Sequence, residues 1–414
     1  MPHSRHLLNV IMDVSAVPRQ PIGAGRYVLN VAQALGARSA GQPSEAALLP
    51  DISLRVVSQR RDTERWNAAG TSPDAVVPTN RFHRLLWEQM RLPAHLVDQY
   101  SQEPFIWHSP HYTFPWKVSG KIPTIVTIHD TTFFDFPQFH ERKKVTFFRR
   151  AIQRSVFTAD RLIAVSEHTA ERIDDLFPRH RPVTVIPHGI DHRHFNTTRT
   201  VADQAVIDRL RGNPFALFVG TLEPRKQVDL LIRAFDAVAE RQRDLRLVLA
   251  GRDGWGMARI EEALYSAKHK GRILRLGYVA EEELPALYRA AAVTIYPSSV
   301  EGFGLPALEA MACGSPLIIA KGTPMDSFAP AAAIRVGATQ ATERATQSPE
   351  SAEKIQDELI AAIEATVTDG PLRAEQLVAG PKTAAAYTWG RTADQHRALY
   401  AELADERGVR THGP

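Results

Sequence analysis

Two glutamates, Glu301 and Glu309, flank a glycine-rich turn and are the strongest candidates for chemistry in this sequence. A short apolar run ends at Pro297, and Pro306 suits the first turn of a helix. We expect the backbone N–H groups of residues 303–305 to bind an anion such as phosphate. Both carboxylates should face the same opening, where they can accept hydrogen bonds from the hydroxyl groups of a sugar or a ribose. The residues of this turn are Gly302, Phe303, Gly304 and Leu305.

A pair of cations, Arg225 and Lys226, forms the second candidate. They close the segment Gly220-Thr221-Leu222-Glu223-Pro224-Arg225-Lys226, which follows an expected strand and precedes a helix expected over 227–241. Arginine offers a two-pronged donor for phosphate oxygens, and lysine offers a compact positive charge. A solvated surface pair is the alternative.

A third candidate is the loop Gly23-Ala24-Gly25, which opens an expected helix after the first strand. Two glycines allow a phosphate or a substrate to approach the backbone and the helix N-terminus closely. Val28 occupies the position where a dinucleotide-binding fingerprint requires a third glycine. A tight strand-to-helix turn without a ligand is the alternative.

The elements that must position these residues are short apolar strands alternating with helices along 414 residues. This pattern predicts α/β architecture with two doubly wound, Rossmann-like domains that face each other across a cleft. We expect an N-terminal domain over 1–195, a C-terminal domain over 196–388 and a last helix within 389–414. Strands are expected at 7–14, 52–58, 105–109, 124–129, 161–165, 183–186, 215–220, 245–250, 272–276, 292–296 and 316–320.

These motifs together resemble glycosyltransferase family 4, whose members have the two-domain GT-B fold. The segment from Glu301 to Glu309 is similar to the family's E-x7-E motif, and residues 220–226 resemble its diphosphate-binding segment. Ile128-His129-Asp130 resembles the family's histidine-bearing loop, and Ile186-Pro187-His188-Gly189 its interdomain segment. The segment from Tyr387 to Tyr400 is similar to the closing helix, which the family returns to the first domain.

The resemblance implies a retaining transferase that moves a hexosyl group from a nucleotide diphosphate sugar to an acceptor. Glu309 would bind the ribose, Glu301 the hydroxyls of the transferred sugar, and Arg225 with Lys226 the leaving diphosphate. His129 would contact the donor sugar, although a structural role is the alternative. The base would lie near Tyr278 and Val279.

The resemblance favours GDP-mannose as the donor, and it implies no further cofactor. We expect no metal site, because no D-x-D triplet occurs in the sequence. Two other functions remain open: another two-Rossmann enzyme, such as a nucleotide-sugar epimerase or a nicotinamide-linked oxidoreductase, and a non-catalytic partner subunit of a transferase. The single cysteine, Cys313, is expected in the core of the helix that carries Glu309.

The positive charge of the chain is concentrated in its first half. Residues 1–195 carry 24 Lys and Arg against 18 Asp and Glu, whereas residues 196–414 carry 26 against 28. A basic, partly aromatic segment over 142–154 suits a helix on an anionic membrane surface, where a glycan or lipid-linked acceptor would be bound. A solvated helix is the alternative, and no nucleic-acid partner is expected. We expect a cytoplasmic protein, peripheral at the inner face of the membrane, with these membrane-facing cations: Arg142, Lys143, Lys144, Arg149 and Arg150.

Overall fold

The computed structural model describes residues 7–21, 23–36, 49–78, 80–329, 332–337, 349–368 and 370–409. The chain forms two compact units, which are Met1–Gly189 with Thr388–Pro414 and Ile190–Tyr387. We call them unit 1 and unit 2. The predicted first boundary, after residue 195, differs from the observed one, because Phe195 is buried and its ring lies 6.3 Å from that of Tyr288 in unit 2.

Unit 1 is built on a seven-stranded sheet whose order is β3-β2-β1-β4-β5-β6-β7, with every neighbouring pair parallel. Register places Met12 beside His108 and Asp13 beside Val57, so the carboxyl ends of β1, β2 and β4 meet at one edge. The strands are β1 (Leu7–Asp13), β2 (Asp51–Gln59), β3 (Ser72–Val77), β4 (Ile106–Ser109), β5 (Thr124–Ile128), β6 (Arg161–Ala164) and β7 (Val183–Val185).

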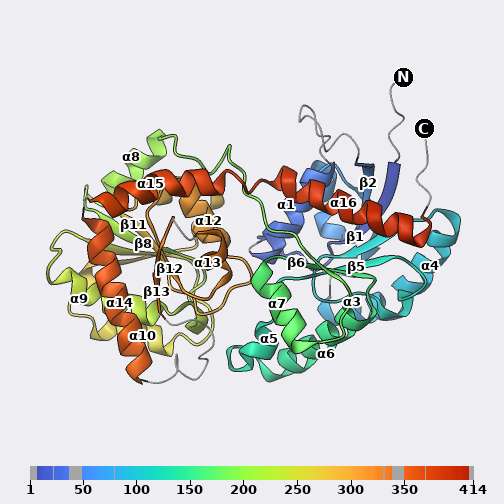
Figure 1. The fold of residues 1–414 in the computed structure, drawn as a ribbon, viewed down its shortest axis with the longest axis horizontal. Helices are drawn as coiled ribbons and strands as arrows, with labels where there is room; N and C mark the ends of the chain where they lie inside the picture. Colours follow the sequence, from blue (N-terminus) through green and yellow to red (C-terminus); the bar gives the residue numbers. More distant parts are fainter. Residues whose placement is uncertain are drawn as a thin grey trace. The chain divides into compact units, whose positions relative to one another are not determined.

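Helices cover both faces of this sheet, as Figure 1 shows. Side chains alternate along β1, so Val10 and Met12 pack with α1 and α16, whereas Ile11 joins the core on the other face with Ile152 of α6. The helices are α1 (Ala24–Gly36), α2 (Thr63–Ala68), α3 (Arg81–Met90), α4 (Leu92–Gln102), α5 (Thr132–Asp135), α6 (Arg142–Thr158), α7 (Glu167–Leu176) and α16 (Trp389–Arg407).

The last helix, α16, returns to unit 1, as the resemblance implied. Leu399, Tyr400 and Leu403 are buried in the same core as Val28 and Val31 of α1. Arg397 donates hydrogen bonds to the carbonyls of Ala34 and Leu35, at 3.1 and 3.2 Å, and so caps the end of α1. The C-terminal segment is therefore part of the core of unit 1.

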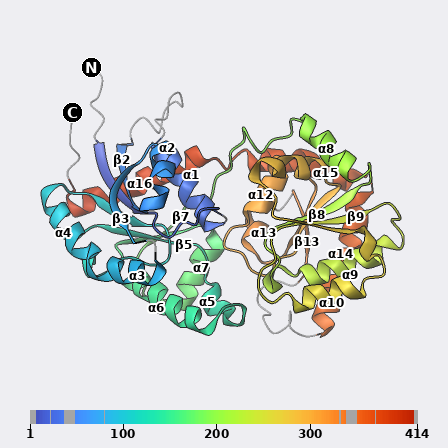
Figure 2. The same ribbon diagram turned by 180° about the vertical axis from the view of Figure 1, so that it is seen from behind.

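Unit 2 contains a six-stranded parallel sheet in the order β10-β9-β8-β11-β12-β13. Helices α9 and α14 pack together, as do α12 and α15, and Figure 2 shows the two pairs on opposite faces of the sheet. The strands are β8 (Phe215–Val219), β9 (Arg246–Ala250), β10 (Ile273–Gly277), β11 (Val293–Tyr296), β12 (Leu317–Ala320) and β13 (Ile334–Val336). The helices are α8 (Val201–Arg209), α9 (Val228–Ala239), α10 (Ala258–Ser266), α11 (Leu284–Ala290), α12 (Leu305–Ala312), α13 (Pro324–Phe328), α14 (Pro349–Val367) and α15 (Pro371–Ala384).

Within the described residues, none of the helices combines the length and the apolar composition that crossing a bilayer requires. Both units follow the predicted architecture of doubly wound parallel sheets, in which ligands bind at the carboxyl ends of the strands. Polar side chains at those ends are therefore the place to look for a site.

Candidate functional site

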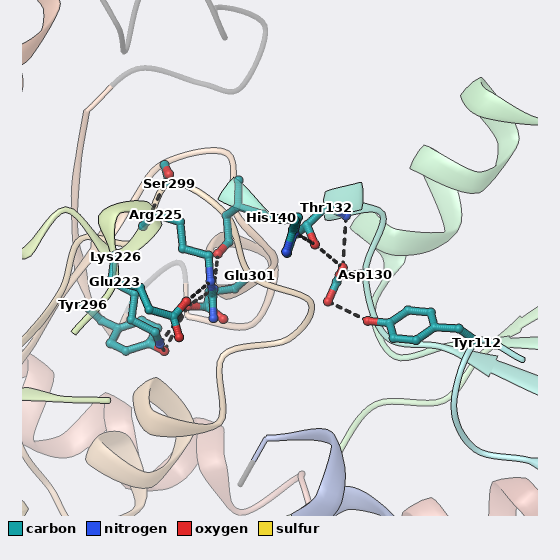
Figure 3. A network of polar contacts seen from close by, with 11 residues as sticks. Tyr112, Asp130, Thr132, His140, Glu223, Arg225, Lys226, Tyr296, Ser299 and Glu301 are labelled. Carbon is teal, nitrogen blue, oxygen red and sulfur yellow. Dashed lines mark hydrogen bonds and ion pairs between the residues drawn. The ribbon is translucent and has the colours of Figure 1, made fainter. Parts of the chain in front are cut away.

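The cations Arg225 and Lys226 meet Glu301 in unit 2, at the carboxyl ends of the neighbouring strands β8 and β11 (Figure 3). Oε1 of Glu301 lies 3.0 Å from Nη1 of Arg225 and 3.1 Å from Nζ of Lys226. The structure thus brings the adjacent cations together with Glu301, which lies 75 positions after Lys226 in the sequence. The solvated-surface alternative for Lys226 is wrong, because only 6% of this residue is exposed.

Two further residues, to which the sequence analysis gave no role, belong to this group. The hydroxyl of Tyr296, which ends β11, donates to Glu301 at 3.0 Å and accepts from Lys226. Glu223 accepts from Nε of Arg225 at 2.9 Å. The position of Tyr296 at the carboxyl end of a strand was the signal that could have identified it.

Burial and charge act in opposite directions on the ionisable groups of this cluster. Burial alone would raise the pKa of Glu301, but the charges and hydrogen bonds of Arg225 and Lys226 lower it to about 2. Burial lowers the pKa of Lys226, and the neighbouring Arg225 lowers it further, while Glu301 opposes the change. The pair is therefore a carboxylate and a buried cation, held in place without a ligand.

The backbone around this cluster is tightly packed. A Cβ atom at Gly220 would lie 3.0 Å from Nζ of Lys226, in a backbone conformation (φ 143°) that other residues rarely adopt. The carbonyl of Arg225 accepts from the backbone N–H and the hydroxyl of Ser299, at 2.9 Å each, which ties the two strand-end loops together. The lysine position is therefore fixed from both loops.

The glycine-rich turn leads into α12, as predicted. Gly304 precedes the first helical residue, Leu305, and its carbonyl accepts from the amides of Ala307 and Leu308, while Pro306 has no N–H to donate. Phe303 is buried and stacks on Phe328 with 5.2 Å between ring centroids. Gly302 lies between Glu301 and Phe303, so the side chains on both sides of this glycine are held in place.

Glu309 lies one turn into α12 and is almost fully buried, with 1% of its surface exposed. It accepts a hydrogen bond of 2.9 Å from the hydroxyl of Tyr288 on α11, a residue that the sequence analysis did not single out. Cys313, at the end of this helix, is buried as expected, and burial raises the pKa of its thiol to about 12.

The predicted base-binding residues follow β10. Tyr278 is 49% exposed, and the guanidinium of Arg252 lies 4.4 Å from the centre of its ring. Val279 is partly exposed. Within the described residues, no group of three or more His, Cys, Asp and Glu is arranged to hold a metal ion.

In unit 1, His129 follows β5 and is surrounded by rings. Its Nε2–H donates to the carbonyl of Pro110 at 2.7 Å, and its ring contacts those of Tyr27 and Tyr112. Burial lowers its pKa, so the imidazole is neutral. The adjacent Asp130 accepts from Tyr112 at 2.8 Å and from Thr132 at 2.6 Å (Figure 3).

The loop Gly23-Ala24-Gly25 opens α1 as predicted. The carbonyl of Gly23 accepts from the amides of Arg26 and Tyr27. Gly25 is buried against Pro18 and Pro21, which shows that it also has a packing role.

The basic segment forms α6, but its cations are not equivalent. Arg149 differs from the prediction of a membrane-facing side chain, because it is half-buried and donates to the carbonyls of Phe133 and Phe134. Arg142, Lys143 and Arg150 are exposed, and Lys144 forms an ion pair with Glu141. Phe147 is 44% exposed.

Comparison with known proteins gives a glycosyltransferase family model for each half of the chain. The model Glycosyltransferase Family 4 matches residues 21–194, and the model Glycosyl transferases group 1 matches residues 203–366. The O-antigen chain mannosyltransferase B of Escherichia coli is 32% identical over 221 residues, which are 52% of this chain and 56% of that protein. The chain thus spans just over half the length of this curated relative.

Solved structures share the fold over nearly the whole chain. Sucrose-phosphate synthase from Thermosynechococcus elongatus superposes with a TM-score of 0.72 at 19% identity, covering 96% of this chain and 100% of its own. HepE from Anabaena, solved in complex with UDP-glucose, superposes with a TM-score of 0.67 at 15% identity, covering 95% of this chain and 99% of its own. At these identities the likeness establishes the fold alone. The two family models, the E-x7-E turn and the paired parallel sheets show that the chain belongs to glycosyltransferase family 4 and has the GT-B fold.

Proposed function

We propose that the protein is a retaining glycosyltransferase that takes a hexosyl group from a nucleotide diphosphate sugar. The observation that carries this proposal is the buried cluster of Arg225, Lys226 and Glu301 at the carboxyl ends of β8 and β11. When the bond from sugar to phosphate breaks, negative charge grows on the diphosphate and positive charge grows on the sugar. Preorganised cations stabilise the first, and a carboxylate that holds sugar hydroxyls stabilises the second.

Each donor-site residue then has a distinct task. Arg225 and Lys226 bind the departing diphosphate, and the amides at the start of α12 add their dipoles. Glu301 accepts from the hydroxyls of the transferred sugar, and Glu309 from the ribose. The base stacks near Tyr278, beside Arg252, and contacts Val279.

The transferred sugar is mannose, and the donor is GDP-mannose. The matched part of a relative named as a mannosyltransferase supports this choice. A structural neighbour was solved with UDP-glucose, so the uridine donor is the competing candidate. No side chain of the cluster is a free nucleophile. The resemblance to the family implies that the acceptor hydroxyl attacks from the face that the diphosphate leaves, and that a phosphate oxygen takes its proton.

Unit 1 supplies the acceptor side of the reaction in this proposal. His129 contributes a neutral imidazole to the donor sugar, and Gly23, Ala24 and Gly25 form a loop that a substrate can approach. The acceptor is a glycan or a lipid-linked sugar. The cations of α6 attach the enzyme to the anionic surface where such a lipid is found.

A thermal-shift screen with GDP, UDP, ADP and dTDP and their sugars tests the donor. A ligand at 100 times its Kd adds about 2.7 kcal/mol of stability. GDP and GDP-mannose should therefore clearly raise the midpoint temperature of unfolding. Transfer from the selected donor should then continue in excess EDTA, because Arg225 and Lys226 carry the positive charge. Stabilisation without transfer to any acceptor would favour a non-catalytic partner subunit. Interconversion of the sugar without transfer would favour an epimerase.

A further inference from the structure

Unit 1 contains a cavity of about 350 Å³ that the donor site does not use. It lies at the carboxyl ends of β1 and β4, where a doubly wound sheet binds its ligand. Asp13, Arg84, Glu88 and His111 line it. Asp13 is the last residue of β1 and shares the face of Ile11, so its side chain faces the α6 side of the sheet.

Two carboxyl groups meet in this cavity through Ser15. The amide of Ser15 donates to Asp13 at 3.0 Å, and its hydroxyl donates to Oε1 of Glu88 at 3.0 Å. Nε of Arg84 lies 3.2 Å from the same oxygen of Glu88. Burial, together with the neighbouring Asp13, raises the pKa of Glu88 to about 8. At neutral pH the pair therefore holds a proton and offers both a hydrogen-bond donor and acceptors.

The cavity also leaves a polar atom unsatisfied. Nε2 of His111 is buried and has no hydrogen-bond partner among the described residues. A buried polar atom of this kind costs free energy unless a ligand or water pairs with it. A donor, acceptors and an unsatisfied ring nitrogen together match the hydroxyl groups of a neutral sugar.

A larger cavity of about 950 Å³ adjoins the first. The two share Glu88, Thr113, Lys143 and Phe147 as lining residues. Aromatic side chains line the larger one, including Trp116 (41% exposed), Phe147 (44%) and Phe157 (40%).

Cations stand among these rings. Lys143, Arg150 and Arg154 line the same cavity, and Arg154 lies 4.5 Å from the ring centre of Trp116. Exposed apolar surface beside positive charge matches a ligand that carries both a hydrocarbon chain and an anionic group.

We propose that these joined cavities bind the acceptor as a single amphiphile, whose terminal sugar enters the smaller cavity against Asp13 and Glu88 and whose phosphate and hydrocarbon chain occupy the larger one. This inference rests on the proposed function, because it names the acceptor class of that reaction. Lys143 lines both cavities and binds the phosphate at their junction, while Arg150 and Arg154 extend the positive surface along the chain.

The test compares three probes of increasing length by saturation-transfer NMR: methyl α-mannoside, mannose 1-phosphate and dodecyl mannosyl phosphate below its micelle concentration. The phosphate should tighten binding about tenfold through charge-assisted hydrogen bonds, and the chain should add about tenfold again. Equal affinities for mannose 1-phosphate and dodecyl mannosyl phosphate would overturn the proposal that the acceptor is an amphiphile, since a soluble sugar phosphate would then bind as well.

Variants assign the subsites. Glu88→Ala and Asp13→Asn should weaken all three probes at least tenfold, whereas Glu88→Gln, which imitates the protonated acid, should stay within about threefold of wild type. Lys143→Gln combined with Arg150→Gln should remove the advantage of the phosphate and leave methyl mannoside unchanged. The pair Arg241→Gln and Lys268→Gln, on the exposed surface of unit 2, is the charge-matched control.

Folding is checked on each variant by its thermal midpoint. Because Glu88 is an acid whose pKa is raised by the fold, Glu88→Gln should unfold at the same temperature as wild type or higher at pH 7.5. Wild-type binding of all probes by Glu88→Ala and Asp13→Asn would overturn the sugar subsite. GDP and UDP stabilisation, measured on the same samples, reports unit 2 separately. Sugar binding without nucleotide binding would therefore leave this inference standing while the proposed donor reaction fails.

Discussion

At the scale of single residues, the buried cation Lys226 is the most informative group. Desolvation disfavours its charge, whereas Glu301 favours it, and the hydroxyl of Tyr296 accepts a hydrogen bond from the ammonium group. A site that keeps such a charge in place before substrate arrives loses little reorganisation energy when the diphosphate departs. The charge and its partner come from loops far apart in the sequence, so the contact between them could not be derived from either motif alone.

Replacing Lys226 should therefore slow turnover more than it weakens folding. Lys226→Ala removes a charge-assisted contact to the leaving group, and we expect kcat to fall by about 10²–10³. Lys268→Ala, at a lysine of unit 2 whose side chain is 76% exposed, is the control and should retain full activity. A purified Lys226→Ala protein with wild-type kcat would remove this segment from the donor site.

The two glutamates of the turn should separate in their effects on donor binding. Glu309→Gln should weaken GDP binding several-fold in calorimetry, because its proposed partner is the ribose. Glu301→Gln should leave the affinity for GDP within about twofold and lower kcat, since its proposed partner is the sugar. The same loss of GDP affinity in both variants would contradict this division of tasks.

At the scale of elements, the sequence predicts the central strands better than the edges. The strands that the expected set lacks are β3 and β13, and each lies at an edge of its sheet. Ser72, Pro73 and Asp74 open β3, a composition that an edge strand tolerates but that gives no apolar run. β13 is three residues long and contains Arg335. The edge strands β7 and β10 were recognisable because they open with an apolar or β-branched run, which β3 and β13 lack.

The cationic surface of α6 should bind anionic membranes. Near such a surface each cation contributes about 1 kcal/mol, and the Debye length falls to about 3 Å at 1 M salt. Sedimentation with acidic vesicles should therefore show binding at low salt that NaCl abolishes. Changing Arg142, Lys143, Lys144 and Arg150 to Gln should remove it, whereas Arg149 is left in place because it supports Phe133 and Phe134.

The control for this experiment carries the same change of charge elsewhere. Arg241, Arg259, Lys268 and Lys270 are exposed in unit 2, and their replacement by Gln should leave vesicle binding intact. If wild type fails to sediment with acidic vesicles at low salt, α6 is a solvated helix.

The start of α16 depends on a close backbone approach. A Cβ atom at Gly189 would lie 2.2 Å from the backbone nitrogen of Trp389, so no side chain fits there without moving one of the two segments. Gly189→Ala should lower the stability of unit 1 by about 2 kcal/mol or more, measured as a lower midpoint in chemical denaturation. Gly271→Ala, where a Cβ atom meets nothing within 4 Å, should be close to neutral. Equal denaturation midpoints for Gly189→Ala and Gly271→Ala would show that the backbone at Gly189 and Trp389 accommodates a Cβ atom without strain.

At the scale of the whole molecule, the two units differ in the chemistry of their buried polar groups. Unit 2 buries a cation against a carboxylate. Unit 1 buries a histidine network, in which His108 contacts Tyr400 and Thr127, while the hydroxyl of Tyr27 donates to His396. The members of the Arg225, Lys226 and Glu301 cluster were predictable because each motif is continuous in the sequence, although the contact between the motifs was not. The histidine network was not, because its members are brought together only by the sheet and by the return of α16.

This difference predicts that acid will open unit 1 first. Burial lowers the pKa of His108 and His188 well below the usual value, and that of His396 to about 4. The unfolded chain binds protons at these histidines below pH 6.5, whereas the folded chain does not. The stability that the neutral histidines contribute to unit 1 is therefore present above pH 6.5 and is lost as the pH falls. Each of these histidines therefore lowers the stability of unit 1 below pH 6.5, while the raised pKa of Glu88 in the same unit offsets part of this loss.

Hydrogen exchange at pH 7.0 and 5.5, with exchange times scaled for the intrinsic rate, measures this directly. Peptides from α1, β4, β5 and α16 should lose protection at pH 5.5, while those from β8, β9, β11 and β12 should keep it. His108→Gln cannot titrate and should lose less protection than wild type over the same interval. Loss of protection in unit 2 first, or in both units to the same extent, would mean that the buried histidines do not control the acid stability of this protein. The carboxylate of Glu301, whose pKa is about 2, gives no such loss in this pH range, because it stays ionised down to pH values well below 5.5.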